Sequence, residues 1–181
     1  MSSNFSVSIS SSAPAVGRKV FEAPVDVGAR SAVWLGAPSM FGLALPDASP
    51  TPSQMYAPRG VYFDDEVFIA CDTGNHRVLI WQGVPDEDHA EADVVLGQPD
   101  FYSEGPNAGG RGPENGVHLP TGVAVYEGKL FVADAWNHRI LGWRAPLSDR
   151  DADFVIGQPD FEKAVEWPYG SQGPFALRFP Y

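Results

Sequence analysis

The chain has 181 residues, of which 44% are hydrophobic and 19% are charged, a balance typical of a folded globular protein. Its formal net charge of −11 leaves 12 Lys and Arg residues along the whole length, which argues against nucleic acid and anionic membranes as partners. No stretch approaches the roughly 20 apolar residues of a membrane span, and the single Cys71 cannot form an internal disulfide. The first nine residues also lack the pattern of a secretion signal, so we expect a soluble, cytoplasmic protein with no direct membrane insertion.

Turn-forming residues and the N-terminal segment come first along the chain. The sequence holds 19 Gly and 17 Pro residues without a collagen period, which favours many short strands joined by tight connections. Residues 1–17 are rich in Ser and Ala and are expected to form a flexible N-terminal arm. Within this arm Phe5, Val7 and Ile9 alternate with serines, so an edge strand and a disordered tail both remain open.

Two segments further along recur in register. Residues 72–81 return 62 positions later as residues 134–143, and each copy follows an apolar run. Residues 92–101 return 60 positions later as residues 152–161, with eight of ten positions identical. Repetition at a fixed period indicates an array of equivalent structural units.

Each unit has the pattern of four short strands, and no stretch shows convincing helical periodicity. The expected strands span residues 60–63, 67–71, 76–81 and 94–97 in the first unit, and 122–125, 129–133, 138–143 and 154–157 in the second. Four antiparallel strands in a radially repeated unit describe the blade of a β-propeller. We therefore expect an all-β, β-propeller-like segment at 18–181, with two complete blades at about 58–97 and 120–157 and partial blades at 18–36 and 177–181.

The repeated motifs resemble those of the NHL-repeat family. Each unit carries Pro-x-Gly-Val, then an apolar strand ending in Cys71-Asp72 or Ala133-Asp134, then Asn-His-Arg and a β-branched residue. The Leu of the family's usual motif is replaced here. The Gly-Gln-Pro-Asp-Phe segment is similar to a bacterial branch of the family with units of about 60 residues. The resemblance covers about residues 30–180 and implies a propeller fold.

The repeated residues have mechanical roles that need no catalysis. Asp accepts backbone N–H bonds in turns and Asn tolerates left-handed geometry, Arg pairs with carboxylates, and Trp fills the space between sheets. Gly60 and Gly122 would allow a close approach of strands. We expect a structural repeat lock made of Asp72, Asn75, His76, Arg77 and Trp81 in the first unit and of Asp134, Asn137, His138, Arg139 and Trp143 in the second.

The sequence shows no catalytic constellation and implies no cofactor. His118 is a weak metal candidate, because the equivalent positions hold Tyr56 and Arg178 and propellers often specialise where their blades differ. A catalytic zinc site needs about three protein ligands, and the innermost expected strands offer no carboxylate or His. A metal-dependent lyase or hydrolase with a site in the propeller channel remains the alternative function.

The long connections between units are the expected recognition elements. Residues 101–117 and 161–177 are long for connections in a compact domain, and their aromatic residues are of types enriched at interfaces. We expect a protein partner to contact a set of residues in these connections: Tyr102, Arg111, Phe161, Trp167, Tyr169 and Phe175.

A propeller closes with at least about four blades, and two complete ones are expected here. Association with a second copy, cover by another subunit and a longer parent chain are all open explanations. The expected function is that of a non-catalytic NHL-repeat scaffold or accessory subunit that mediates protein–protein interaction. NHL-like proteins accompany some multi-subunit metalloenzymes, so the resemblance implies an assembly such as a hydrogenase as one setting.

Overall fold

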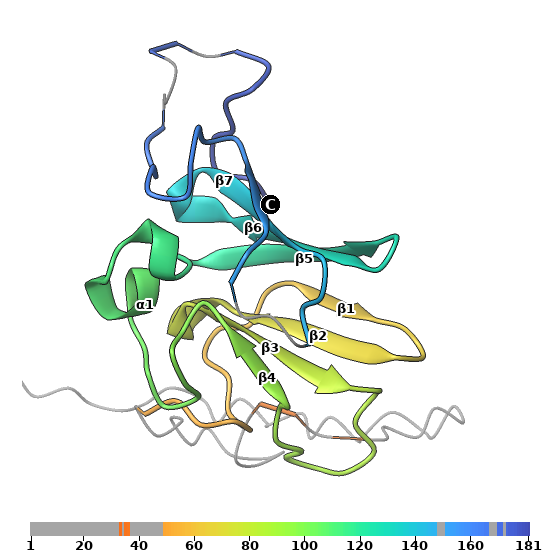
Figure 1. Ribbon diagram of the computed structural model, residues 1–181. Coiled ribbons are helices and arrows are strands. Elements are labelled where there is room, and N and C mark those ends of the chain that lie inside the picture. Colours follow the sequence, from red (N-terminus) through yellow and green to blue (C-terminus); the bar gives the residue numbers. More distant parts are fainter. Residues whose placement is uncertain (1–32, 34, 37–48, 148–150, 167–169, 172) are drawn as a thin grey trace, which may run out of the picture. The chain divides into compact units, whose positions relative to one another are not determined.

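The computed structural model describes residues 33, 35, 36, 49–147, 151–166, 170, 171 and 173–181, which all belong to one compact unit, Ala32–Tyr181. The predicted arm at 1–17 and most of the partial blade at 18–36 lie outside the described residues. The described chain is all-β with short helical turns, as predicted (Figure 1). No helix in this part of the chain is long and apolar enough to cross a membrane.

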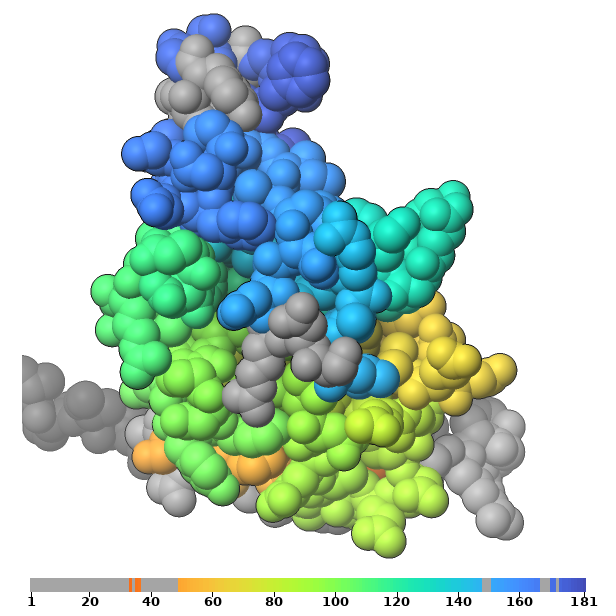
Figure 2. Space-filling view, in the orientation of Figure 1, coloured from red at the N-terminus to blue at the C-terminus, as the bar shows by residue number. Residues whose placement is uncertain are grey.

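Two four-stranded antiparallel sheets make up the fold, each with its strands in sequence order. The first sheet contains β1 (Val61–Phe63), β2 (Val67–Asp72), β3 (Arg77–Gln82) and β4 (Val94–Leu96). The second contains β5 (Pro120–Tyr126), β6 (Lys129–Asp134), β7 (Arg139–Trp143) and β8 (Phe154–Ile156). The strands predicted between residues 58 and 157 are therefore confirmed, with ends that differ by one or two residues. The β1–β2 and β5–β6 hairpins project on the same side of the molecule (Figures 1 and 2).

Short helical turns separate the strands. A 3₁₀ turn joins β2 to β3 (Thr73–Asn75), and another joins β6 to β7 (Ala135–Asn137). The long connection between the sheets carries α1 (Pro106–Gly110) and a 3₁₀ turn (Pro113–Asn115). Helical periodicity does not indicate α1, because this element has only five residues and three successive ones have left-handed backbone angles.

One prediction about these turns was wrong. Asn75 and Asn137 were expected to take the left-handed conformation, and His76 and His138 to begin a strand. Instead each His closes the turn with φ of 54°, and each Asn lies inside the 3₁₀ turn. Left-handed geometry is unfavourable for a residue with a Cβ. A backbone hydrogen bond to each imidazole, described below, offsets that cost.

The two sheets pack with one face of the first against the opposite face of the second. Cross-strand partners share a face of a sheet, so the pairings define a front face and a back face for each one. The main core joins the front face of the first sheet to the back face of the second. The front face supplies Ile69, Cys71, Val78, Ile80, Val94 and Leu96, and the back face supplies Leu130, Val132, Leu141 and Trp143. Burial in this core raises the pKa of the Cys71 thiol to about 12.

The back face of the first sheet forms a second core, and it repeats the composition of the back face of the second sheet. Its buried members are Ala70, Leu79, Trp81, Ala92 and Val95. Each of the first three stands at the repeat position of a residue in the main core: Val132, Leu141 and Trp143. The same set of residue positions thus makes the same kind of surface in both units.

Gly60 and Gly122 lie where the backbones of successive units come into close contact. A Cβ on Gly60 would come within 2.6 Å of the carbonyl oxygen of Thr121 and 3.0 Å of the Cα of Gly122. A Cβ on Gly122 would in turn lie 2.9 Å from the carbonyl carbon of Tyr181. Any side chain would force these backbones apart, so glycine is needed for close approach rather than for a special φ.

Candidate functional site

The motif residues of the first unit converge on a buried guanidinium. Arg77 is fully buried, and its Nε donates to Oδ2 of Asp72 at 2.7 Å. Its Nη1 donates to the carbonyl of Phe101 at 2.5 Å, and its Nη2 donates to the carbonyls of Thr51 and Gln54, each at 2.8 Å. One side chain therefore ties the turn after β2 to the chain segments that precede and follow the first sheet in the sequence.

Arg139 makes the same contacts in the second unit. Its Nε donates to Oδ2 of Asp134 at 2.8 Å, and its Nη1 donates to the carbonyl of Phe161 at 2.6 Å. Its Nη2 donates to the carbonyls of Pro113 and Gly116 at 2.6 and 2.9 Å. The Nε, Nη1 and Nη2 atoms of Arg139 all donate hydrogen bonds within the fold, which gives this Arg a structural role.

The two aspartates accept hydrogen bonds from three directions. Asp134 accepts from the Arg139 guanidinium, from Nδ2 of Asn137 at 2.8 Å and from the backbone N–H of His118 at 2.6 Å. Asp72 has the equivalent set of donors in the first unit. Burial raises the pKa of both carboxyls, and the neighbouring guanidinium opposes that shift. Because every partner is a donor, the arrangement suits the ionised carboxylate.

Gln98 and Gln158 belong to the same framework, although the sequence reasoning assigned them no role. Nε2 of Gln98 donates to the carbonyl of His76 at 3.1 Å and to that of Gly105 at 2.8 Å. Nε2 of Gln158 donates to the carbonyl of His138 at 3.2 Å. The signal that could have found them was their identity in both copies of the Gly-Gln-Pro-Asp-Phe segment.

His76 and His138 join one unit to the next. The backbone N–H of Leu119 donates to Nδ1 of His76 at 3.1 Å, and the backbone N–H of Phe179 donates to Nδ1 of His138 at 3.3 Å. An Nδ1 that accepts a hydrogen bond carries no proton, so both rings are neutral in this geometry. Burial lowers the pKa of His76 to about 4, with a further contribution from His118.

The ring of His118, which precedes β5, lies in a row of rings with His76 and Trp136, which belong to the turns between the second and third strands. Its ring centroid is 5.1 Å from that of His76 and 5.6 Å from that of Trp136. Trp136 continues the row to Phe179 at 5.7 Å, and its side chain is 53% exposed. Burial lowers the pKa of His118. Within the described residues, no three His, Cys, Asp or Glu side chains gather closely enough to hold a metal ion.

The predicted partner-binding residues have different environments. Tyr102 is 69% exposed and Phe175 is 76% exposed, and Arg111 is also exposed. Phe161 packs against the main core, and its carbonyl accepts from Arg139. Its packing within the fold thus accounts for this aromatic residue. Trp167 and Tyr169 lie outside the described residues.

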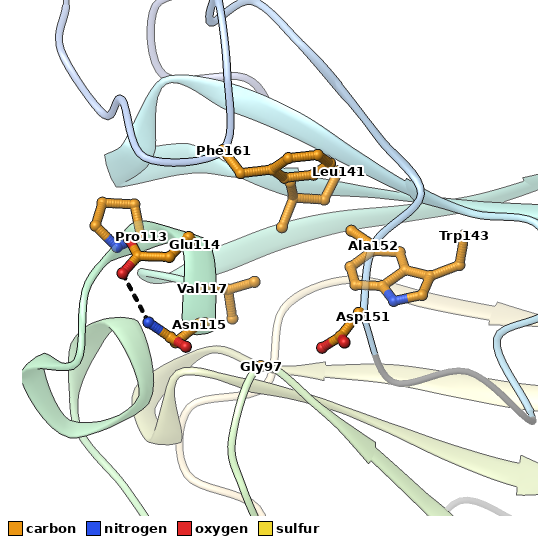
Figure 3. A pocket seen from close by; sticks show the side chains of 11 residues that line it. Gly97, Pro113, Glu114, Asn115, Val117, Leu141, Trp143, Asp151, Ala152 and Phe161 are labelled. Atoms are coloured by element: carbon orange, nitrogen blue, oxygen red, sulfur yellow. Dashed lines mark hydrogen bonds between the residues drawn. The ribbon is translucent and has the colours of Figure 1, made fainter.

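Two cavities lie between the sheets. One, of about 240 Å³, is bounded by the 3₁₀ turn before β5 and by the end of β7 (Figure 3). Among the described residues, its lining includes the carboxylates of Glu114 and Asp151 and no Lys, Arg or His. The other, of about 520 Å³, lies near the hairpins and is lined by residues of both signs, among them Asp64, Glu66 and Arg144. The described residues of neither lining form the basic cluster that a phosphate ligand requires.

The front face of the second sheet is more exposed than the front face of the first. In the first sheet, Leu96 and Val78 occupy this face and are 1% and 0% exposed. At the repeat positions of the second sheet, Ile156 is 45% exposed and Ile140 is half-buried. Half-buried Phe131 and Phe154 stand in the same face, and their rings contact edge to face, with centroids 5.6 Å apart.

Comparison of the sequence with protein-family models and with curated proteins found no match.

Proposed function

We propose that this chain is a segment of an NHL-type β-propeller that acts as a non-catalytic scaffold or accessory subunit by binding protein. The two equivalent sheets pack front face against back face, and each contains the same buried ion pair, Asp72–Arg77 or Asp134–Arg139. Both features support the propeller interpretation. The polar residues of the repeated motif are engaged in contacts that hold the units together, which supports a structural rather than a catalytic role for them.

The open front face of the second sheet carries the proposal. A sheet face with Phe131, Phe154 and Ile156 is an apolar surface of the kind that marks interaction sites. Its counterpart on the first sheet is covered by another sheet of the same chain. The cover that this face requires is therefore a sheet-like protein surface, supplied by a second copy or by another subunit of an assembly such as a metalloenzyme complex.

Affinity enrichment from the native source would test the proposal, with Ile156→Asp as the disrupting variant. The matched control is Val84→Asp, because Val84 is 56% exposed and lies in the connection between β3 and β4, outside the sheet face and outside the connections expected to contact a partner. We expect a defined protein, including untagged copies of the chain itself, to be enriched by the wild type and the control and lost with I156D. Equal recovery with I156D would refute binding through this face.

A further inference from the structure

The internal interface shows what kind of surface covers a front face. The front face of the first sheet meets Leu130, Val132, Leu141 and Trp143, which are alternate residues of β6 and β7. These belong to the back face, and Val123 and Val125 of β5 pack beside them. A front face of this repeat is thus complementary to a back face of the same repeat.

On the back face of the first sheet, two residues of β1 are exposed. Val61 and Phe63 of β1 are 55% and 64% exposed, whereas Val123 and Val125, at the same positions of β5, pack against the main core. Phe63 stacks on Phe68 with centroids 6.4 Å apart, so the exposed ring is continuous with the second core. Among the described residues, each copy therefore presents an exposed front face on the second sheet and a partly exposed back face on the first.

Contacts at the end of the second unit define where the next sheet would lie. Gly97 adjoins Val117 and Gly157 adjoins Leu177 in the same manner, since a Cβ on either glycine would lie within 2.7 Å of that side chain. Phe179 bonds to His138 as Leu119 bonds to His76. The segment at residues 177–181 therefore follows the path by which residues 117–121 enter the second sheet. A further sheet entered by this path would lie over the front face of the second sheet, as the second sheet lies over that of the first.

We propose that the front face of the second sheet binds, head to tail, the exposed back face of the first sheet in a second copy of this chain. This inference rests on the proposed function and names the partner. The contact would bury Phe131, Phe154 and Ile156 of one copy against Val61 and Phe63 of the other. A heterologous contact of this kind either closes into a ring or continues as a chain of copies.

Charge opposes this association, so the apolar contact must drive it. Each copy has a net charge of −11, and like charges repel until salt screens them. We therefore expect the apparent dissociation constant to fall, by severalfold, as salt is raised from low to moderate concentration. Association through surface ion pairs would weaken over the same range.

Light scattering on the purified full chain, combined with mixing of two variants, tests the proposal. The wild type and the control V84D should show a mass above that of a single 19.5 kDa chain. Ile156→Asp, on the front face, and Phe63→Asp, on the back face, should each be monomeric. Circular dichroism and the urea midpoint must show that both variants are folded, with Ile156→Ser and Phe63→Ser as milder replacements if they are not.

A mixture of I156D and F63D should again associate, as pairs that hold one of each chain, because one variant keeps its back face and the other keeps its front face. A monomeric wild type at concentrations of about 100 μM, or a mixture that stays monomeric, would overturn the self-association. A monomeric wild type that still enriches a foreign protein through Ile156 would leave the scaffold function standing. Loss of both results would remove the two proposals together.

Discussion

Replacement of Arg139 by Met tests whether the buried Asp134–Arg139 ion pair stabilises its unit. The change removes the charge-assisted bond to Asp134 and the three bonds to the carbonyls of Phe161, Pro113 and Gly116. It leaves a fully buried carboxylate without its countercharge. Breaking a buried pair from one side costs about 3–5 kcal/mol. That is a large share of the roughly 5–15 kcal/mol that stabilises a typical domain.

The assay is urea unfolding followed by tryptophan fluorescence. With an m-value of about 2 kcal/mol per M, the expected loss lowers the midpoint by roughly 1.5–2.5 M. The matched control is Arg144→Met. Arg144 is 64% exposed and pairs with Asp153 at 2.9 Å, so its loss should cost less than about 1 kcal/mol. Failure of R139M to fold while R144M folds also fits the account. A loss below about 1 kcal/mol, or equal losses in both variants, would refute the reasoning.

Two further predictions concern pH and close packing. The pKa of His76 in the folded chain, about 4, lies below the usual value of 6.5, so the unfolded chain binds more protons between these values and stability falls as pH drops from about 6.5 to 4. His76→Gln should reduce that loss of stability by about 1–2 kcal/mol, a figure lowered because the ring is partly exposed. Urea midpoints measured from pH 7 to 4.5 that run parallel for the variant and the wild type would contradict this. Gly60→Ala should cost about 1–3 kcal/mol, because its Cβ would lie 2.6 Å from the Thr121 carbonyl oxygen. Gly173→Ala, with no atom within 4 Å of the added Cβ, should change the urea midpoint little, and similar losses in the two variants would argue against the close approach.

The strands were predictable because two local signals agree. Alternating apolar residues set the strands, and polar turn residues recur at a fixed spacing between them. Because the two units repeat in register, the strand pattern expected in one could be checked against that of the other. The position of the left-handed residue was not predictable in the same way. Turn propensity favours Asn75, but the conformation falls on His76, whose ring is held by the N–H of Leu119, 43 residues away.

The candidate site depends on packing that the sequence pattern does not encode. Phe131 and Ile69 occupy equivalent positions in similar strands, yet Ile69 is 1% exposed and Phe131 is half-buried. Which of them is covered depends on the order in which the sheets stack. Likewise, Tyr102 and Phe161 are both aromatic residues of long connections, but only Phe161 packs against the main core. Partners distant in sequence decide both cases.

Photo-crosslinking from position 156 tests the central claim most directly. A photoreactive amino acid in place of Ile156 would stand on the open front face of the second sheet, and the purified chain would be irradiated at about 100 μM. The account predicts crosslinks between two chains, with mass spectrometry placing them at or near Val61 and Phe63 of the second copy. Crosslinks confined to the same chain, or between chains but distant from β1, would contradict it.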